Sequence, residues 1–396
     1  MNILLILLIS ILFLERLLKF LLVVRFFRRT IPSHRQSVTL VSILQPVLSG
    51  DPTMPTGLEQ NLTLQTGYPL EFLWLVDEDD FEAQRICRDL LARHPDKKAR
   101  MILLPPPGPR QSPKMIKLIA GARHASGDVL CVLDDDTRLP DFGLETCLPF
   151  LDQPGVGLAF GLPYYVSFGN FWSRLVAYFV NSHSLMSYVP YAMLAEPVTI
   201  NGMFYAIRRA VLEDIGGFDG LETILADDFA IAQRMRARGY RLAQTPLRHA
   251  ISTWVGTPRH YFSLTQRWFI FPRESMLRHL NAREQVSFYG MALLPVFLPW
   301  LAILVPVLAP GLWLVSLLYF TCNHLIFMRF NWAYLKRTSP WSHSYWVTLI
   351  ALLLPLQVLA ALFAPQRVNW RGNILQVEPG GGFELVRRRG EEEDHP

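Results

Sequence analysis

The chain has 396 residues, more than one typical domain requires, and 51% of them are hydrophobic, which is high for a purely soluble enzyme. Its formal net charge of +5 suits a protein that rests on anionic lipid headgroups. A basic chain can also bind nucleic acid, but no cluster combines basic and aromatic residues here, so we expect a membrane partner and no nucleic acid.

An apolar segment opens the chain. Residues 1–24 are apolar apart from a few polar positions such as Glu15 and Lys19, and several arginines follow at once. A cleaved signal peptide would carry its basic residues before the apolar run, so we predict a retained transmembrane anchor over residues 1–29. Because arginine and lysine mark the cytosolic end of a membrane segment, the residues after the anchor are expected in the cytosol.

A second apolar region lies near the C-terminus. Residues 290–328 contain no Asp, Glu, Lys or Arg. One span needs about 20 residues, so this run predicts two helices, broken near Pro306, Pro310 and Gly311. Residues 345–365 form a further apolar run that is either a span or a re-entrant segment. We therefore predict membrane helices over 289–365 and a cytosol-facing tail over 366–396 with a disordered end.

Between these regions, residues 33–283 alternate short apolar runs with amphipathic helices. We predict strands at 41–45, 72–76, 101–104 and 129–133, with helices at 82–93 and 114–125. This alternation predicts an α/β domain with a mostly parallel sheet covered on both faces. In such sheets ligands bind beyond the carboxyl ends of the strands.

Two of the predicted strands end in acidic residues. Asp77 follows one strand, and Asp134, Asp135 and Asp136 follow another. In extended backbone, Asp134 and Asp136 point to the same side, where they can share one hard divalent cation such as Mg²⁺ or Mn²⁺. The alternative is an Asp-rich turn or a helix cap.

Three other features carry candidate chemistry. Asp227 and Asp228 precede the predicted helix 229–238, where Asp228 is either a base for a hydroxyl proton or part of a helix cap. His183 is either a site residue or a structural histidine. Arg267 and Trp268 either stack on one another or supply a guanidinium that binds phosphate.

Read together, these segments resemble the ceramide glucosyltransferase family, a branch of the GT-A glycosyltransferases of family 2. The resemblance runs nearly end to end, and its order of segments is hard to produce by chance. Its residues are Tyr68-Pro69, Asp77, Ser112-Pro113-Lys114, Asp134–136, Gly161-Leu162-Pro163-Tyr164, Asn201-Gly202-Met203, Ala226-Asp227-Asp228-Phe229, Arg267-Trp268 and the segment 367–373. Two positions depart from it: Leu264 stands where the family has Gln or Arg, and Asp136 is an acid that ceramide enzymes can lack.

The resemblance implies a GT-A fold and a UDP-sugar donor whose sugar, glucose or similar, passes to a membrane lipid hydroxyl in one inverting, non-processive step. Asp77 would hold the uracil and ribose, and Asp134 with Asp136 the metal ion and diphosphate. Asp228 would be the base. The other implied contacts are Lys114, Arg267 and Trp268 on the donor, Met203 on the acceptor, and His183 on either.

Three alternatives remain open. The lipid acceptor is ceramide-like, a hopanoid or diacylglycerol, and the apolar run 185–197 is either a lipid-facing segment or ordinary core. A processive polysaccharide synthase is less consistent with Leu264 and with the small number of predicted spans. A catalytically inactive homologue would have lost carboxylates that this chain keeps. We expect an integral membrane protein with its catalytic domain on the cytosolic face, in a bacterial plasma membrane or a Golgi-type membrane.

Overall fold

The computed structural model describes residues 3–33, 37–370 and 372–387; Arg371 and the predicted disordered end 388–396 lie outside the described residues. The chain folds into two compact units. The helical unit consists of Met1–Thr30, Tyr164–Glu196 and Leu280–Ala364. The α/β unit consists of Ile31–Pro163, Pro197–His279 and Pro365–Pro396. This division differs from the predicted boundaries, because residues 164–196 of the predicted domain 33–283 fall in the helical unit and the tail falls in the α/β unit.

Within the described part of the α/β unit, eight strands form one sheet in the order β3-β2-β1-β4-β7-β6-β8-β5. Strands β3, β2, β1 and β4 are parallel to one another, and β7 runs antiparallel to both β4 and β6. Strand β6 therefore shares the direction of those four, and the predicted mostly parallel sheet is confirmed. The strands are β1 (Val41–Pro46), β2 (Leu70–Asp77), β3 (Ala99–Leu104), β4 (Val129–Leu133), β5 (Thr137–Arg138), β6 (Val156–Tyr165), β7 (Phe204–Arg208) and β8 (Arg241–Ile251).

The helices of this unit begin where local chemistry favours a start. Asp80 accepts a hydrogen bond from the Ala83 N–H at the start of α3 (Phe81–Arg93), and Ser112 accepts one from Met115 at the start of α4 (Pro113–His124). Both caps satisfy backbone donors that a helix leaves unpaired. The predicted helices at 82–93 and 114–125 are thus confirmed within a residue at each end. The other helices are α2 (Met54–Leu62), α6 (Arg209–Asp214), α7 (Asp227–Ala237), α8 (Pro258–Phe271) and α9 (Leu277–His279).

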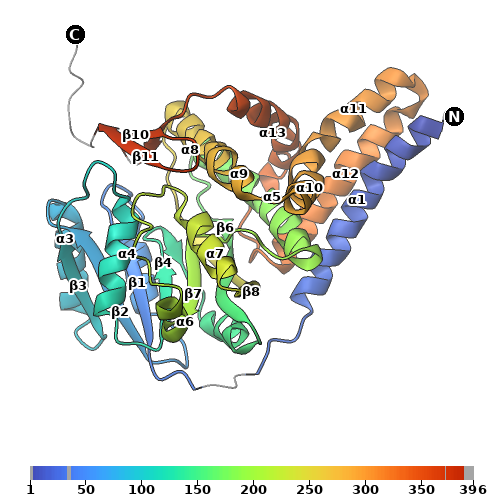
Figure 1. Cartoon of the computed structure of the whole chain (residues 1–396). Helices are drawn as coiled ribbons and strands as arrows, with labels where there is room; N and C mark the ends of the chain where they lie inside the picture. The colour runs from blue at the N-terminus through green and yellow to red at the C-terminus, as the bar shows by residue number, and fades with distance from the viewer. Residues whose placement is uncertain (1–2, 34–36, 371, 388–396) are drawn as a thin grey trace, which may run out of the picture. The chain divides into compact units, whose positions relative to one another are not determined.

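Alternate residues of the central strands supply two cores, one on each face of the sheet. Ile43 and Trp74 pack with α2 and α3 on one face. Leu44 and Leu75 pack with α4, α6 and α7 on the other (Figure 1). Because both faces are covered, β2 and β4 are buried along nearly their whole length, which is why they read as continuous apolar runs.

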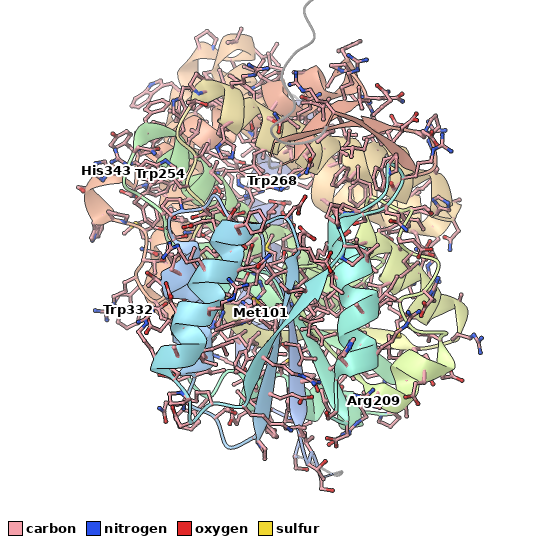
Figure 2. The ribbon with its side chains drawn as sticks, turned by 90° about the vertical axis from the view of Figure 1, so that its left-hand side faces the viewer. Met101, Arg209, Trp254, Trp268, Trp332 and His343 are labelled. Carbon is pink, nitrogen blue, oxygen red and sulfur yellow. The ribbon has the colours of Figure 1, made fainter. Side chains whose placement is uncertain are left out.

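The strand register places the acidic residues at one edge of the sheet. Leu44 of β1 pairs with Leu73 of β2 and with Val132 of β4, so the carboxyl ends of the three strands lie side by side. Arg209 marks the opposite edge, since its N–H donates to the carbonyl of Asp128 just before β4. Figure 2 shows Trp268 of α8 at the end of the sheet away from Arg209.

The tail forms a small antiparallel sheet that sequence reasoning did not predict. Its strands are β9 (Arg367–Trp370), β10 (Asn373–Val377) and β11 (Phe383–Arg387). Val368 and Leu375 pack with Ile270 of α8, and the Gln266 amide donates to the carbonyl of Pro365 at 3.0 Å. The segment 366–387 is therefore an integral layer of the α/β unit.

The helical unit contains α1 (Ile3–Phe27), α5 (Phe171–Leu194), α10 (Ala282–Phe288), α11 (Leu298–Leu308), α12 (Trp313–Ala333) and α13 (Trp346–Leu362). Figure 1 shows α1, α11 and α12 side by side, and Phe20 of α1 stacks on Phe330 of α12 with ring centroids 5.5 Å apart. The predicted hairpin is confirmed, because Ala282–Leu308 and Pro310–Ala333 are each long and apolar enough to cross a membrane.

The two hairpin helices expose most of their apolar surface, as lipid-facing helices do and soluble core helices do not: only 28% and 11% of their most apolar segments are buried. Helix α1 is 25 residues long and mostly apolar, but it carries Glu15, Arg16 and Lys19 in its middle, and among the described helices it is not one of the two candidate spans. The predicted anchor is thus a helix, and its role as a membrane span stays a prediction. Helix α13 is shorter, at 17 residues.

We expect Gly127→Ala to destabilise the α/β unit. A Cβ at this position would lie 2.6 Å from the Leu40 carbonyl oxygen and 2.8 Å from the Ser42 nitrogen, and neither backbone atom can move cheaply. Overpacking of this kind costs about 1–3 kcal/mol, which lowers a melting temperature by several degrees. Gly67→Ala is the matched control, because its nearest contact is 3.6 Å away, at the Glu145 carboxylate. Equal melting of the two variants would contradict the expectation.

Candidate active site

The acidic triplet after β4 lies in a turn and not in extended backbone, because the Thr137 N–H donates to the Asp134 carbonyl at 3.1 Å; this is the Asp-rich turn given as the alternative. Asp135 is buried, and its Oδ2 accepts a hydrogen bond from the Leu48 N–H at 2.9 Å, which ties the loop after β1 to the end of β4. Asp134 and Asp136 are half-buried. Asp136 Oδ2 accepts from the Thr253 hydroxyl at 3.0 Å. The middle acid ties two loops together, while the outer two are more exposed and contact other side chains.

Lys114, in the first turn of α4, joins two acidic segments. Its Nζ lies 2.8 Å from Asp134 Oδ1 and 3.2 Å from Asp227 Oδ2, and it donates to the Gly202 carbonyl at 2.9 Å. Burial opposes the charged form, but the two carboxylates outweigh it and raise the pKa of Lys114. Burial also raises the pKa of Asp134, with Lys114 opposing that shift. The ammonium thus holds the end of β4 against the start of α7.

Asp228 lies beside this cluster in the first turn of α7. The residue at the N-cap position is Ala226, whose side chain makes no capping hydrogen bond, so Asp228 lies in the first turn of the helix and not at its N-cap. Asp228 Oδ1 accepts a hydrogen bond from the Phe229 N–H at 2.7 Å. Burial, and then the negative charge of Asp227, raise the pKa of Asp228 to about 7.

Gly202 leaves room for the Asp228 side chain. A Cβ at Gly202 would lie only 3.0 Å from the Asp228 Cβ. Met203 lies next to it, and its carbonyl accepts the Asp134 N–H at 2.9 Å. The segment 201–203 therefore positions both carboxylates through its backbone, which explains why a glycine stands there.

Asp77 forms a second charged pair at the same edge, and its partner was missed from the sequence. Lys117 is 2% exposed, and its Nζ lies 2.8 Å from Asp77 Oδ2 and 2.9 Å from the Val47 carbonyl oxygen. Burial raises the pKa of Asp77, and Lys117 opposes the shift. Asp77 Oδ1 is buried and accepts no hydrogen bond from the described residues. The spacing of Lys114 and Lys117, three residues apart on one face of a helix, was the signal that could have revealed it.

The remaining predicted site residues are distributed over both units. Arg267 and Trp268 are half-buried on α8 of the α/β unit, and Leu264, which replaces the polar residue of the family motif, is buried. His183 lies on α5 of the helical unit, where its Nδ1 is 3.0 Å from the Phe179 carbonyl oxygen. The structure therefore brings together Lys114, Asp134, Met203 and Asp228, with Asp77 and Asp136 at the same edge of the sheet.

Asp134 and Asp136 suit a divalent cation only in part. Both offer the hard oxygen ligands that Mg²⁺ and Mn²⁺ prefer. In the described part of the chain, however, no group of three or more His, Cys, Asp or Glu side chains is arranged to hold an ion. A cation here would have to take further ligands from phosphate oxygens and water, as Mg²⁺ commonly does. The residues thus fit a cation that binds together with a diphosphate.

Paired carboxylates and a buried lysine lie at the carboxyl ends of the strands of this mixed sheet. Such an arrangement suits an enzyme that binds a polar, phosphate-bearing ligand. The sequence matches glycosyl transferase family 21 over residues 4–383, and the chain therefore belongs to that family. The resemblance stated from the motifs is thereby confirmed, as is the expectation of a glycosyltransferase at the level of the family.

Among named relatives, the chain is 22% identical over 248 residues to ceramide glucosyltransferase 1 of Caenorhabditis elegans, covering 62% of this chain and 52% of that protein. It is 25% identical over 246 residues to the probable glycosyltransferase YdaM of Bacillus subtilis (strain 168), covering 59% and 55%. Ceramide glucosyltransferase 3 of C. elegans is 22% identical over 354 residues, covering 86% and 73%. The chain thus spans about half the length of the first two relatives.

Two solved structures are also similar. One is the mannosyltransferase PcManGT from Pyrobaculum calidifontis in complex with GDP-Man and Mn²⁺, with a TM-score of 0.48 and 18% identity, covering 90% of this chain and 97% of that one. The other is GalNAc-T7 with UDP, GalNAc and Mn²⁺, with a TM-score of 0.43 and 12% identity, covering 67% and 58%.

We expect Lys117→Met to destabilise the α/β unit far more than a surface lysine change. It would leave the buried Asp77 carboxylate without its cation, and breaking a buried pair in this way costs about 3–5 kcal/mol. Adding Asp77→Asn should recover more than half of the loss, because the unpaired charge is then gone. Unfolding in denaturant measures both effects.

Lys98→Met is the matched control for that experiment. Lys98 Nζ lies 3.4 Å from Glu71 Oε2, but its side chain is 60% exposed, so its loss should cost no more than about 1 kcal/mol. If Lys117→Met and Lys98→Met lose the same stability, the Asp77–Lys117 pair does not hold the strand end.

Proposed function

We propose that this chain is a GT-A glycosyltransferase that moves a sugar from a UDP-sugar to a hydroxyl of a membrane lipid in one inverting, non-processive step. The observation that supports it most is Asp228, a carboxyl group with a pKa of about 7 beside the Lys114 cluster at the carboxyl edge of the sheet. A general base works best when its pKa lies near the operating pH. Neutral pH therefore leaves Asp228 able to accept the acceptor's proton.

The proposed roles divide between the two ends of the donor. Asp77, with its buried Oδ1, offers an acceptor to the imide N–H of uracil, and Lys117 fixes the orientation of that carboxylate. Lys114 has a positive charge to offer the diphosphate, and Arg267 and Trp268 are proposed on the donor side as well. Asp228 takes the proton of the lipid hydroxyl as the sugar is transferred, with Met203 and His183 proposed on the acceptor side.

A divalent cation is part of this proposal. Asp134, Asp136 and Asp227 bring negative charge to the site, and Lys114 alone cannot offset both these acids and a bound diphosphate. Mg²⁺ or Mn²⁺ held by Asp134 and Asp136 would offset the charge of the leaving diphosphate. The named structures that hold Mn²⁺ with a nucleotide or nucleotide sugar are consistent with this idea.

The lipid acceptor is proposed from the relatives and from the helical unit. Two of the relatives are named ceramide glucosyltransferases, and the hairpin of α11 and α12 exposes apolar surface to which a bilayer would be the partner. We propose a ceramide-like acceptor, with hopanoids and diacylglycerol as alternatives of the same chemistry. We further propose that α1 is embedded in the membrane and that the α/β unit is on the cytosolic face.

We expect Asp228→Asn to reduce lipid glycosylation by roughly 10²–10⁴, because an amide cannot take a proton. UDP-sugar affinity should remain normal, since the donor does not need the base in order to bind. Transfer rate and donor affinity are measured on the purified protein, with Asp227→Asn as the neighbouring control that should lose less activity. In the wild type, transfer should rise as the pH passes through about 7. Near-normal transfer by Asp228→Asn would rule out this mechanism.

Stability gives an independent check on the same residue. Because folding raises the pKa of Asp228, its contribution to stability is present at low pH and is lost as the pH rises through about 7. Asp228→Asn removes the charge that folding disfavours, so its melting temperature should gain on the wild type's as the pH rises from about 4, the unfolded pKa, to about 7, and should equal or exceed it at pH 8. A variant that is much less stable at pH 8 would mean that the carboxylate is structural.

We expect Asp136→Asn to lose most of its transfer activity and to weaken Mn²⁺ binding in the presence of UDP, measured by electron paramagnetic resonance. Asp79→Asn, at an exposed acid of the same edge, should bind Mn²⁺ normally. EDTA should inactivate the wild type reversibly. Full activity in EDTA would contradict the metal site, and Arg267 would then be the charge partner to test.

A further inference from the structure

The helical unit contains a cavity of about 50 Å³, and its lining includes His183, which the proposed reaction places on the acceptor side. A water needs roughly 10–15 Å³ of such space, so the cavity has room for a polar group larger than one water. Helices α1, α5, α12 and α13 contribute to its wall. Apolar side chains such as Phe327 and Met186 line one part, and Arg16, Lys19, Asn181 and Asn323 line another.

The wall of this cavity is positively charged. Arg16 and Lys19 both line it, and its described lining residues include no Asp or Glu. Lys19 is 7% exposed, with its Nζ 2.8 Å from Glu15 Oε1 and 3.0 Å from the Met291 carbonyl oxygen. Arg16 contacts the same Glu15 and donates to Asn323 Oδ1 at 3.2 Å. Two cations therefore share one carboxylate.

This imbalance has an energetic consequence. A buried charge without a full counter-charge costs several kcal/mol, and a unit with long apolar helices offers little water to reduce that cost. An ammonium carries three N–H groups and a guanidinium five, more than the described contacts of Lys19 and Arg16 use. A bound group with a single negative charge would restore neutrality and accept these donors.

From this geometry we infer that the cavity binds the headgroup of a monoanionic lipid, with Arg16 and Lys19 on its phosphodiester and the apolar wall beside its glycerol and first acyl carbons. A lipid is favoured over a free anion because the wall combines two cations with apolar side chains. The proposal concerns binding alone, so it holds or fails independently of sugar transfer.

The test uses the purified full chain in a neutral detergent and measures binding of dihexanoyl phosphatidylglycerol, with dihexanoyl phosphatidylcholine and inorganic phosphate as comparison probes. Phosphatidylglycerol should bind at least about tenfold more tightly than phosphatidylcholine or phosphate, because only phosphatidylglycerol combines a net negative charge with acyl chains. Equal binding of the two lipids, or equal binding of phosphate, would overturn the inference. No donor sugar is present, so an inactive enzyme cannot produce either result.

Two variants change the net charge of the cavity wall in opposite directions. Lys19→Met should weaken binding of the anionic lipid about tenfold, since it removes a charge-assisted hydrogen bond. Glu15→Gln should strengthen it, because the carboxylate that competes for the cations is lost. Arg25→Met, on the exposed part of the same helix, should bind like the wild type. If Lys19→Met does not fold, Glu15→Gln still decides, because weaker or unchanged binding would overturn the proposal.

Discussion

The candidate active site depends on the contact of one lysine with two carboxylates. Asp134 and Asp227 come from segments far apart in the chain, and without a cation between them their repulsion would push β4 and α7 apart. Two unit charges about 4 Å apart interact by about 4 kcal/mol at the effective dielectric of a protein surface. Lys114 turns that repulsion into attraction, and it can do so because Ser112 and Pro113 start α4 at the carboxyl edge of the sheet.

Helix α4 carries two lysines that each form an ion pair with an acid at the end of a strand. Lys114 and Lys117 lie one turn apart on one face, and each binds a carboxylate at the end of a different strand, Asp134 after β4 and Asp77 at the end of β2. One rigid element therefore sets the separation between the two acids. In the proposed reaction these acids contact opposite ends of the nucleotide, so the helix would act as a fixed spacer for the donor. A shift of α4 would disturb both ends at once.

Much of this site could be predicted from the sequence, and the reasons are local. Buried parallel strands read as apolar runs, so β1, β2 and β4 were recognisable. The extended backbone expected over Asp134 and Asp136 was wrong, because the chain turns directly after β4 and the Thr137 N–H bonds to the Asp134 carbonyl. Lys117 was not recognised, because a lysine on an amphipathic helix is usually solvated and only the tertiary fold buries this one. The short strands β9–β11 were missed because their pairing partners, and the α8 surface that buries them, are set by tertiary contacts.

The division of the chain into two units could not be predicted from local sequence patterns either. The segment 171–194 reads as one helix in either unit, and only its packing assigns α5 to the helical unit. A similar limit applies to α1, whose apolar run predicted a simple anchor. Glu15, Arg16 and Lys19 are too many charges for a helix that only spans a bilayer, and intramembrane charges are retained where they have a partner. Within its unit α1 also supplies Arg16 and Lys19 to the wall of a cavity.

The two units thus carry charge imbalances of opposite sign. In the α/β unit the carboxylates of Asp134, Asp136 and Asp227 outnumber the Lys114 ammonium, and a nucleoside diphosphate would add more negative charge. Such a site favours ligands that arrive together with a cation. In the helical unit Arg16 and Lys19 outnumber Glu15, and the missing charge is negative. Each imbalance is costly for an isolated chain and is relieved only by a ligand of the opposite sign. The charges that each unit leaves unbalanced are therefore the ones that specify what it can bind.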